Sequence, residues 1–336
     1  MKKQVIFLWL MVLSLLCQAQ KAENTAMLRD TLVLQEVIVS ANLPLDDKDV
    51  VNFYRTNQFS TLDNINARLG GMSLIKRGAY ALEPQLNGFS GGQLNVTIDG
   101  MRMFGACTDK MDPVTSYIEP TNLKNISVNQ GTNGCQNGCN VGGSVDMTLQ
   151  EPHFKSSYPF NFSLGYGYET VSRSRNVLFS SGYSKKKWAW GLDGVYRKNE
   201  NYRDGNNKVI PFSQFEKTNI HSVLKYSPNQ ISSFKSDILY DVARNVGYPA
   251  LPMDVSLARA ILFALEYQRN GKIQLKGKVY FNTIHHVMDD SKRDSLYLLK
   301  SKPENKSDSV YMRMDMPGKK LYIRTLLPGF NALECP

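Results

Sequence analysis

The sequence lacks a long apolar run beyond residues 1–19. A transmembrane helix needs about 20 consecutive apolar residues, so no such helix is predicted in the rest of the chain. Any membrane span must therefore consist of β-strands, whose alternating pattern is averaged out in a hydropathy profile.

The chain also lacks the signals of two functional classes. Its Lys+Arg 40 against Asp+Glu 30 give a formal charge of +10, but the basic residues are scattered and match no nucleic-acid-binding motif. We expect no nucleic-acid partner and attribute the excess charge to solvated loops and to contacts with anionic head groups. No Ser/His/Asp or paired-carboxylate arrangement is found, and the isolated His153 and His221 are predicted at the surface. We therefore do not expect an enzyme.

The N-terminus has the pattern of a secretory signal peptide, which we predict over residues 1–19. Lys2 and Lys3 form a charged start, residues 5–16 form an apolar core, and Ala19 is a small residue at which a signal peptidase can cut. The apolar core is too short to span a membrane. We therefore expect the protein to be exported.

A polar leader over residues 20–45 contains one strand-forming stretch. It comprises Leu34, Gln35, Glu36, Val37, Ile38, Val39, Ser40 and Ala41. The stretch is rich in β-branched residues and has no hairpin partner nearby. Such a segment suits strand addition to the sheet edge of another protein, and it also fits the first strand of the next domain.

Residues 46–152 are interpreted as a small α+β domain. A helix is predicted over residues 61–69, because Leu62, Ile65 and Leu69 have helical spacing and Thr61 is placed to cap them. Short strands are predicted at residues 72–75, 85–89, 96–99, 126–129 and 143–149.

Two pairs of sulfur-bearing residues lie in this domain. Cys107 and Met111 are four residues apart, so in a helical backbone both sulfurs would lie on one face and suit a soft ion such as monovalent copper. The alternative is a structural cysteine beside a core methionine. Cys135 and Cys139 lie in a glycine-containing segment of an exported chain, which favours a disulfide and leaves a second metal site as the alternative.

From residue 153 the pattern changes to strands of about ten residues in which apolar and polar side chains alternate. They are predicted at residues 160–169, 173–183, 188–197, 217–226, 233–241, 258–268, 272–283 and 309–313. In an exported chain this pattern is typical of an antiparallel transmembrane β-barrel of the outer membrane, with a soluble β-sandwich as the alternative.

The alternation in residues 272–289 is regular enough to assign two faces. Odd positions such as Val279 and Phe281 are apolar and are predicted to meet lipid, whereas the even positions are mostly polar and are predicted to face the barrel interior. His286 and Met288 are even and should face inward, toward the preceding domain. His285 should point the other way.

Taken together, these segments resemble the TonB-dependent outer-membrane receptors. Residues 34–41 resemble the TonB box and residues 46–152 the plug domain, with its hallmarks at residues 95–100 and 142–147. The resemblance implies an α+β plug domain followed by an antiparallel transmembrane β-barrel. It also implies the TonB energy-coupling complex and outer-membrane lipid as partners, and the outer membrane of a Gram-negative bacterium as the location.

A narrower resemblance is to the OprC/NosA-type copper receptors, and it rests on residues 107–117, 248–254, 286–288 and 314–318. In that family a CxxxM pair on the plug and an HxM pair on the barrel bind copper. The matching positions here are Cys107, Met111, His286 and Met288. The resemblance implies import of copper as Cu(I), bound between plug and barrel. The alternatives are a receptor of this type for a siderophore, haem or cobalamin, and a surface-binding protein that does not transport.

The barrel is expected to be incomplete. A plugged transporter barrel has about 22 strands, whereas residues 153–318 accommodate about eight strands of the usual length. Residues 319–336 are interpreted as an aberrant or truncated tail in which the strand pattern is lost. The chain is therefore predicted to be an N-terminal fragment of the receptor.

Overall fold

The computed structural model describes most of the chain beyond residue 50. The described residues are 51, 54, 61–107, 110–131, 140–154, 159–271, 274–289 and 292–293, with the backbone of strands 304–316 and 319–325. All of them belong to one compact unit, Leu45–Pro336. The predicted signal peptide, the predicted TonB-binding residues 34–41, and Cys135 and Cys139 lie outside the described residues. Within the described part, none of the helices has both the length and the apolar character needed to span a membrane.

A short α-helix, α3, lies at Leu62–Asn66 in the first domain. Its N-terminus is closed by Asn64, whose Oδ1 accepts the Thr61 N–H at 2.8 Å. The helix is shorter than the predicted 61–69, because residues 68 and 69 donate their N–H groups three residues back instead of four. Leu62, Ile65 and Leu69 are nevertheless all buried, as their spacing predicts.

Two small sheets complete this domain. The antiparallel pair consists of β1 (Met72–Lys76) and β2 (Leu82–Leu86). The four-stranded sheet has the order β4 (Met101–Arg102), β3 (Asn95–Ile98), β6 (Gly143–Leu149) and β5 (Leu123–Gln130). Only β3 and β6 pair in parallel within it. Within the described connections lie the 3₁₀ helices η1 (Gly91–Gln93), η2 (Val114–Tyr117) and η3 (Pro120–Asn122).

Strand β2 lies earlier in the chain than the predicted 85–89. The Asn87–Gly88 dipeptide ends it, since both residues have positive φ (48° and 87°), which suits a turn and not an extended strand. Phe89 returns to form a single antiparallel bridge with Leu86.

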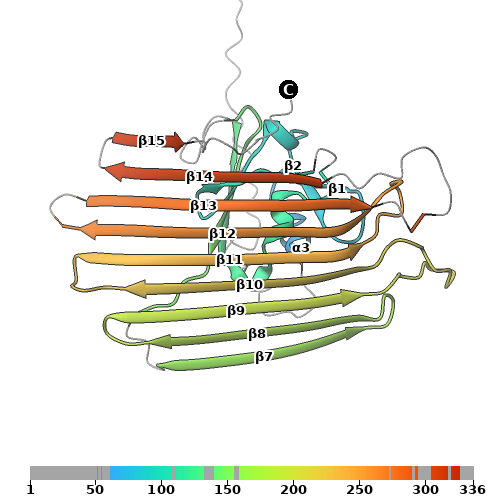
Figure 1. Cartoon of the computed structure of the whole chain (residues 1–336), viewed down its shortest axis with the longest axis horizontal. Helices are drawn as coiled ribbons and strands as arrows, with labels where there is room; N and C mark the ends of the chain where they lie inside the picture. The colour runs from blue at the N-terminus through green and yellow to red at the C-terminus, as the bar shows by residue number, and fades with distance from the viewer. Residues whose placement is uncertain are drawn as a thin grey trace, which may run out of the picture. The chain divides into compact units, whose positions relative to one another are not determined.

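The second part is one antiparallel sheet of nine strands in which each strand pairs with its neighbour in the sequence. Figure 1 shows the strands side by side, from β7 at one edge to β15 at the other. They are β7 (Phe160–Glu169), β8 (Ser174–Ser184), β9 (Trp188–Asn199), β10 (Phe215–Tyr226), β11 (Ser232–Val246), β12 (Asp254–Asn270), β13 (Gln274–Asp289), β14 (Glu304–Met316) and β15 (Lys319–Thr325). Strands β7 and β15 do not pair with each other, so the sheet is not closed into a barrel.

Strand β15 was not predicted. Residues 319–325, where we expect the strand pattern to be lost, instead pair with β14 in a regular register from Met316↔Lys319 to Val310↔Thr325. Leu321 and Ile323 alternate with basic and aromatic residues, which is the same two-residue period as in the earlier strands. The expectation of an aberrant tail is therefore wrong for these seven residues.

The two faces of the sheet differ as the alternation predicts. On β13 the even positions from Lys278 to Met288 are buried and the residues between them are more exposed. A row of four aromatic rings crosses four neighbouring strands, with centroid separations of 4.2, 6.5 and 4.9 Å. The row consists of Trp188, Tyr226, Phe234 and Tyr267. Such a row is typical of the interface between a membrane and water.

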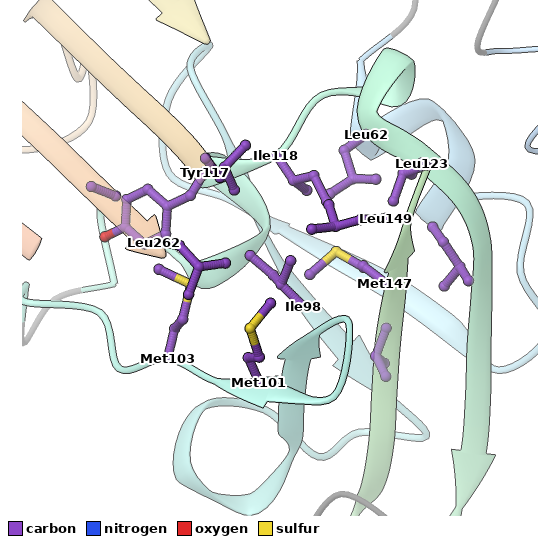
Figure 2. Packing of buried hydrophobic residues seen from close by; sticks show 14 of the residues in the cluster. Leu62, Ile98, Met101, Met103, Tyr117, Ile118, Leu123, Met147, Leu149 and Leu262 are labelled. Atoms are coloured by element: carbon purple, nitrogen blue, oxygen red, sulfur yellow. The ribbon is translucent and has the colours of Figure 1, made fainter. Parts of the chain in front are cut away.

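The buried face of the sheet shares a hydrophobic core with the first domain. The core combines residues of the four-stranded sheet, such as Ile98 and Met147, with Leu239 and Leu262 of the nine-stranded sheet. Figure 2 shows Leu262 of β12 among residues of the first domain, including Tyr117. This shared core fixes the loop that follows β4 against the buried face of β13.

Candidate metal centre

The CxxxM pair lies in a turn of the loop between β4 and η2. Cys107 and Met111 are buried, with 1% and 2% of their surface exposed. The described residues here are not helical: Lys110 has a φ of 53°, and its N–H donates to the Cys107 carbonyl at 3.3 Å. The helical spacing considered for this pair is therefore wrong. The turn nevertheless places both sulfur-bearing side chains in one buried cluster, as we expected of a helix.

The HxM pair lies near the end of β13. His286 and Met288 both belong to the buried face, with 0% and 7% of their surface exposed, as their even positions predict. Met288 packs in the same buried cluster as Cys107 and Met111. The fold thus brings together four side chains that the sequence separates into two distant pairs.

The imidazole of His286 lies beside the thiol of Cys107. One ligand atom each from Cys107, Asp112 and His286 lies within 4.8 Å of the other two, and all three residues are buried. Among the described residues, these three form a cluster whose ligand atoms are close enough to hold one metal ion. Cys107 is a free cysteine. The arrangement offers one thiol, one imidazole nitrogen and two nearby thioethers, which are soft or borderline donors.

Asp112 was missed in the sequence analysis. Its Oδ2 lies 3.0 Å from His286 Nδ1 and accepts the Tyr117 hydroxyl at 2.7 Å. Burial, reinforced by the Asp112 carboxylate, raises the pKa of Tyr117 well above its ordinary value, so this hydroxyl stays protonated and donates. The sequence offers one indication of this role, since Asp112 directly follows the proposed ligand Met111.

The sheet also holds the backbone of the sulfur-bearing turn. Tyr248, in the connection between β11 and β12, donates its hydroxyl to the Met111 carbonyl at 2.5 Å. The ring packs against the first domain where Gly78 has no side chain, since a Cβ there would lie 2.7 Å from Tyr248 Cδ1. The wall therefore holds the turn that carries Cys107 and Met111 through a neutral hydrogen bond, and it packs the same ring against Gly78.

A second set of contacts between the two parts is charged. Asp99, in the turn after β3, pairs with Lys235 at 2.9 Å and Lys278 at 2.8 Å. Burial opposes the ionisation of Asp99, but the two lysines outweigh it and hold the pKa of this carboxyl well below its usual range. We call this group the Asp99 contact.

Glu119 forms the corresponding Glu119 contact, with Arg197 at 3.1 Å and Lys217 at 2.8 Å. Lys217 also lies 3.3 Å from Asp241 of β11. Burial again opposes ionisation, and the two cations hold the pKa of Glu119 below its ordinary value. All of these side chains are buried, so the contact is shielded from solvent.

The surface prediction holds for one isolated histidine and fails for the other. His153 is exposed. His221 is fully buried on β10, with its ring nitrogens 3.8 Å from Asp193 and 3.5 Å from Asp237. The prediction is wrong because the buried face of this sheet is polar, so a histidine on it can be enclosed by carboxylates of the neighbouring strands.

Residues 53–145 match the TonB-dependent Receptor Plug Domain family. Comparison with curated proteins gave no match. Among solved structures, the copper transporter OprC is similar with a TM-score of 0.68 and 19% identity, over 76% of this chain and 40% of that chain.

Two further structures have the same fold with different named cargoes. The FrpB iron transporter from Neisseria meningitidis (F3-3 variant) has a TM-score of 0.63 and 11% identity, over 80% of this chain and 45% of that chain. A double mutant of the Serratia marcescens hemophore receptor HasR, in complex with its hemophore HasA and heme, has a TM-score of 0.63 and 15% identity, over 78% and 39%. The chain spans less than half the length of each of these proteins. Residues 53–145 therefore match the plug domain family, and the chain has the fold of these structures, in which a plug domain is followed by the strands of a β-barrel.

Proposed function

We propose that this chain belongs to a TonB-dependent outer-membrane receptor that imports copper. The ion is bound between the plug and the barrel wall. Its ligands are Cys107, Met111, His286 and Met288. The observation that supports this most directly is the convergence of two plug side chains and two wall side chains in one buried place.

The donor set favours monovalent copper over other metal ions. Thiolate and thioether ligands select soft cations, and hard ions such as calcium and magnesium require oxygen ligands. Zinc can use the thiolate of Cys107 and the imidazole of His286, but thioethers are poor zinc ligands. Binding requires a deprotonated Cys107 and a neutral imidazole at His286.

Release follows from the division of the ligands between two parts of the molecule. In the proposed cycle, the TonB protein takes residues 34–41 as an added strand and pulls on the plug. Movement of Cys107 and Met111 away from His286 and Met288 halves the ligand set. The affinity for the ion then falls, and copper leaves toward the periplasm.

The location follows from the same proposal. The aromatic row on the exposed face of the sheet suits a bilayer interface, in agreement with a barrel in the outer membrane of a Gram-negative bacterium. Receptors of this class are transporters, which agrees with the expectation that the chain is not an enzyme. A receptor for iron, a siderophore or haem would share the fold but would not need these four side chains.

Copper analysis of the full-length protein tests the proposal. After anaerobic loading with Cu(I), Cys107→Ala and His286→Ala are expected to lose the bound ion. Met147→Leu, which changes a buried plug methionine outside the site, is expected to keep it. Unchanged copper stoichiometry in both ligand variants would refute the assignment.

The same preparation separates binding from transport. A Val37→Pro and Val39→Pro variant is expected to retain bound copper and to lose copper uptake into cells, because proline cannot donate to an added strand. Loss of binding and uptake together would argue against a coupling role for residues 34–41.

A further inference from the structure

We infer that Asp112 is a positioning residue of the metal centre, which holds His286 through Nδ1 so that Nε2 is presented to the ion. The inference rests on the proposed copper function and adds a residue to it. Asp112 is outside the four ligands. It is buried on the plug side, whereas His286 belongs to the wall.

The hydrogen bond fixes which ring nitrogen is available. A carboxylate oxygen accepts, so the contact between Asp112 Oδ2 and His286 Nδ1 at 3.0 Å places the ring proton on Nδ1. The lone pair is then on Nε2. A carboxylate that receives the second nitrogen of a metal-bound histidine in this way orients the ring and increases its basicity.

The other ring nitrogen has the properties expected of a vacant ligand position. His286 Nε2 is buried and finds no hydrogen-bond partner among the described residues. A buried polar atom without a partner destabilises the fold, so such an atom in a folded protein calls for an explanation. The neighbouring Cys107 thiol supplies one, because the two groups can share a metal ion.

Asp112 is itself held in place. Tyr117 donates its hydroxyl to the same Oδ2 at 2.7 Å, and it also reaches the Asp112 carbonyl at 3.2 Å. Tyr117 is fully buried in the core of the plug. The chain Tyr117–Asp112–His286 therefore runs from the rigid plug core to the wall, and it sets the imidazole orientation only while the plug is seated.

The hydrogen-bonded series Tyr117–Asp112–His286 also bears on transport. When the plug moves, Asp112 leaves together with Cys107 and Met111, because all three lie in one short loop. His286 then loses two ligand partners and its orienting carboxylate in a single step. The affinity for the ion therefore falls further on plug movement than it would through the loss of two ligands alone.

The test compares Asp112→Ala and Asp112→Asn in the full-length protein loaded with Cu(I). Asp112→Ala is expected to weaken copper binding about 10–100-fold, the usual effect of removing an outer-shell partner. Asp112→Asn retains a carbonyl oxygen that accepts from Nδ1 and is expected to restore most of the affinity. Asp146→Asn changes a partly buried plug carboxylate that accepts hydrogen bonds from Thr97 and Gly100, and it serves as the control with unchanged affinity.

X-ray absorption of the copper-loaded variants gives a readout that a general loss of stability would not produce. The imidazole scattering signal is expected in the wild type and in Asp112→Asn, and is expected to weaken in Asp112→Ala. Wild-type affinity and an intact imidazole signal in Asp112→Ala would overturn the positioning role alone. Loss of one light-atom ligand in Asp112→Asn, with the imidazole signal intact, would make Asp112 a ligand and also overturn it. If His286→Ala bound copper as tightly as the wild type, the proposed function and this inference would be refuted together.

Discussion

The plug meets the wall in two chemically different regions. Around Cys107 and His286 the contacts combine sulfur-bearing side chains with the Asp112 carboxylate, and they leave the buried Nε2 of His286 without a hydrogen-bond partner among the described residues. The buried carboxylate of Glu119 and the partly buried carboxylate of Asp99 are each paired with two cations from the wall. In the charged region each carboxylate already has cationic partners in the wall, whereas under the proposed function the region around His286 takes up an added cation.

This difference assigns separate tasks to the two regions. Buried ion pairs are costly to break, because separation leaves uncompensated charges in a medium of low polarity. The Asp99 and Glu119 contacts therefore hold the plug in the sheet whether or not an ion is bound. Under the proposed function, the site around Cys107 and His286 adds stabilisation only when copper is bound. Different side chains of the plug therefore hold it against the sheet and bind the proposed ion.

The largest expected effect comes from breaking the Glu119 contact. Glu119→Ala removes one partner of Arg197 and one carboxylate partner of Lys217, and all of these side chains are buried. We expect the free energy of unfolding to fall by about 3–5 kcal/mol, the usual cost of removing one partner of a buried ion pair. Denaturant unfolding of the protein in detergent measures it.

The copper response provides the control for that variant. Saturation with ligand at about 100 times the dissociation constant stabilises a protein by about 2.7 kcal/mol. Glu119→Ala should keep this copper-dependent increment, although its starting stability is lower, and Cys107→Ala should lose the increment at nearly unchanged starting stability. If Glu119→Ala abolished the increment, the two regions would not be independent.

The sheet could be predicted from the sequence because its pattern is local. A two-residue period that is sustained over residues such as 274–289 fixes both the strand and the faces of its side chains. The strand boundaries are predicted less accurately. Strand β11 continues to residue 246 and strand β12 begins at residue 254, because the two strands pair with each other beyond the part where the alternation is regular. Strand β15 shows that the same period was present in residues 319–325 and was overlooked.

The candidate site could be predicted only in part. His286 and Met288 followed from parity, but the shape of the loop at Cys107 did not, because a turn with a positive φ at Lys110 leaves no periodic signal. The role of Asp112 depends on a contact between residues far apart in the chain, which one sequence does not reveal. The burial of His221 was missed for the same reason, since its carboxylate neighbours are on other strands.

A smaller effect is expected at Asp63, at the edge of the charged region. Burial raises the pKa of Asp63 from 3.8 to about 7, although the Leu82 N–H opposes the shift. The folded state therefore holds this proton more tightly than the unfolded state, so stability is fully present below about pH 4 and falls as the pH rises toward 7. Because the side chain is only partly buried, solvent screening limits the loss to about 1–2 kcal/mol.

Asp63→Asn is the variant that isolates this contribution. It should flatten the decline of the unfolding free energy between pH 4 and 7 and leave the opposite, acid-side decline due to Asp99 and Glu119 in place. Unfolding midpoints measured at several pH values would reveal the change in slope. An unaltered profile would show that Asp63 does not hold its proton in the folded state.

The smallest expected effect tests whether the neutral region also helps to seat the plug. Tyr248→Phe removes the hydroxyl that donates to the Met111 carbonyl and keeps the ring that packs against Gly78. One hydrogen bond of this kind contributes about 1 kcal/mol, so the unfolding free energy should fall by that amount in the absence of copper. Because the turn carries two of the proposed ligands, the copper-dependent increment should also decrease slightly, which Glu119→Ala should not cause. Equal increments in Tyr248→Phe and the wild type would mean that the wall holds the turn without tuning the metal centre.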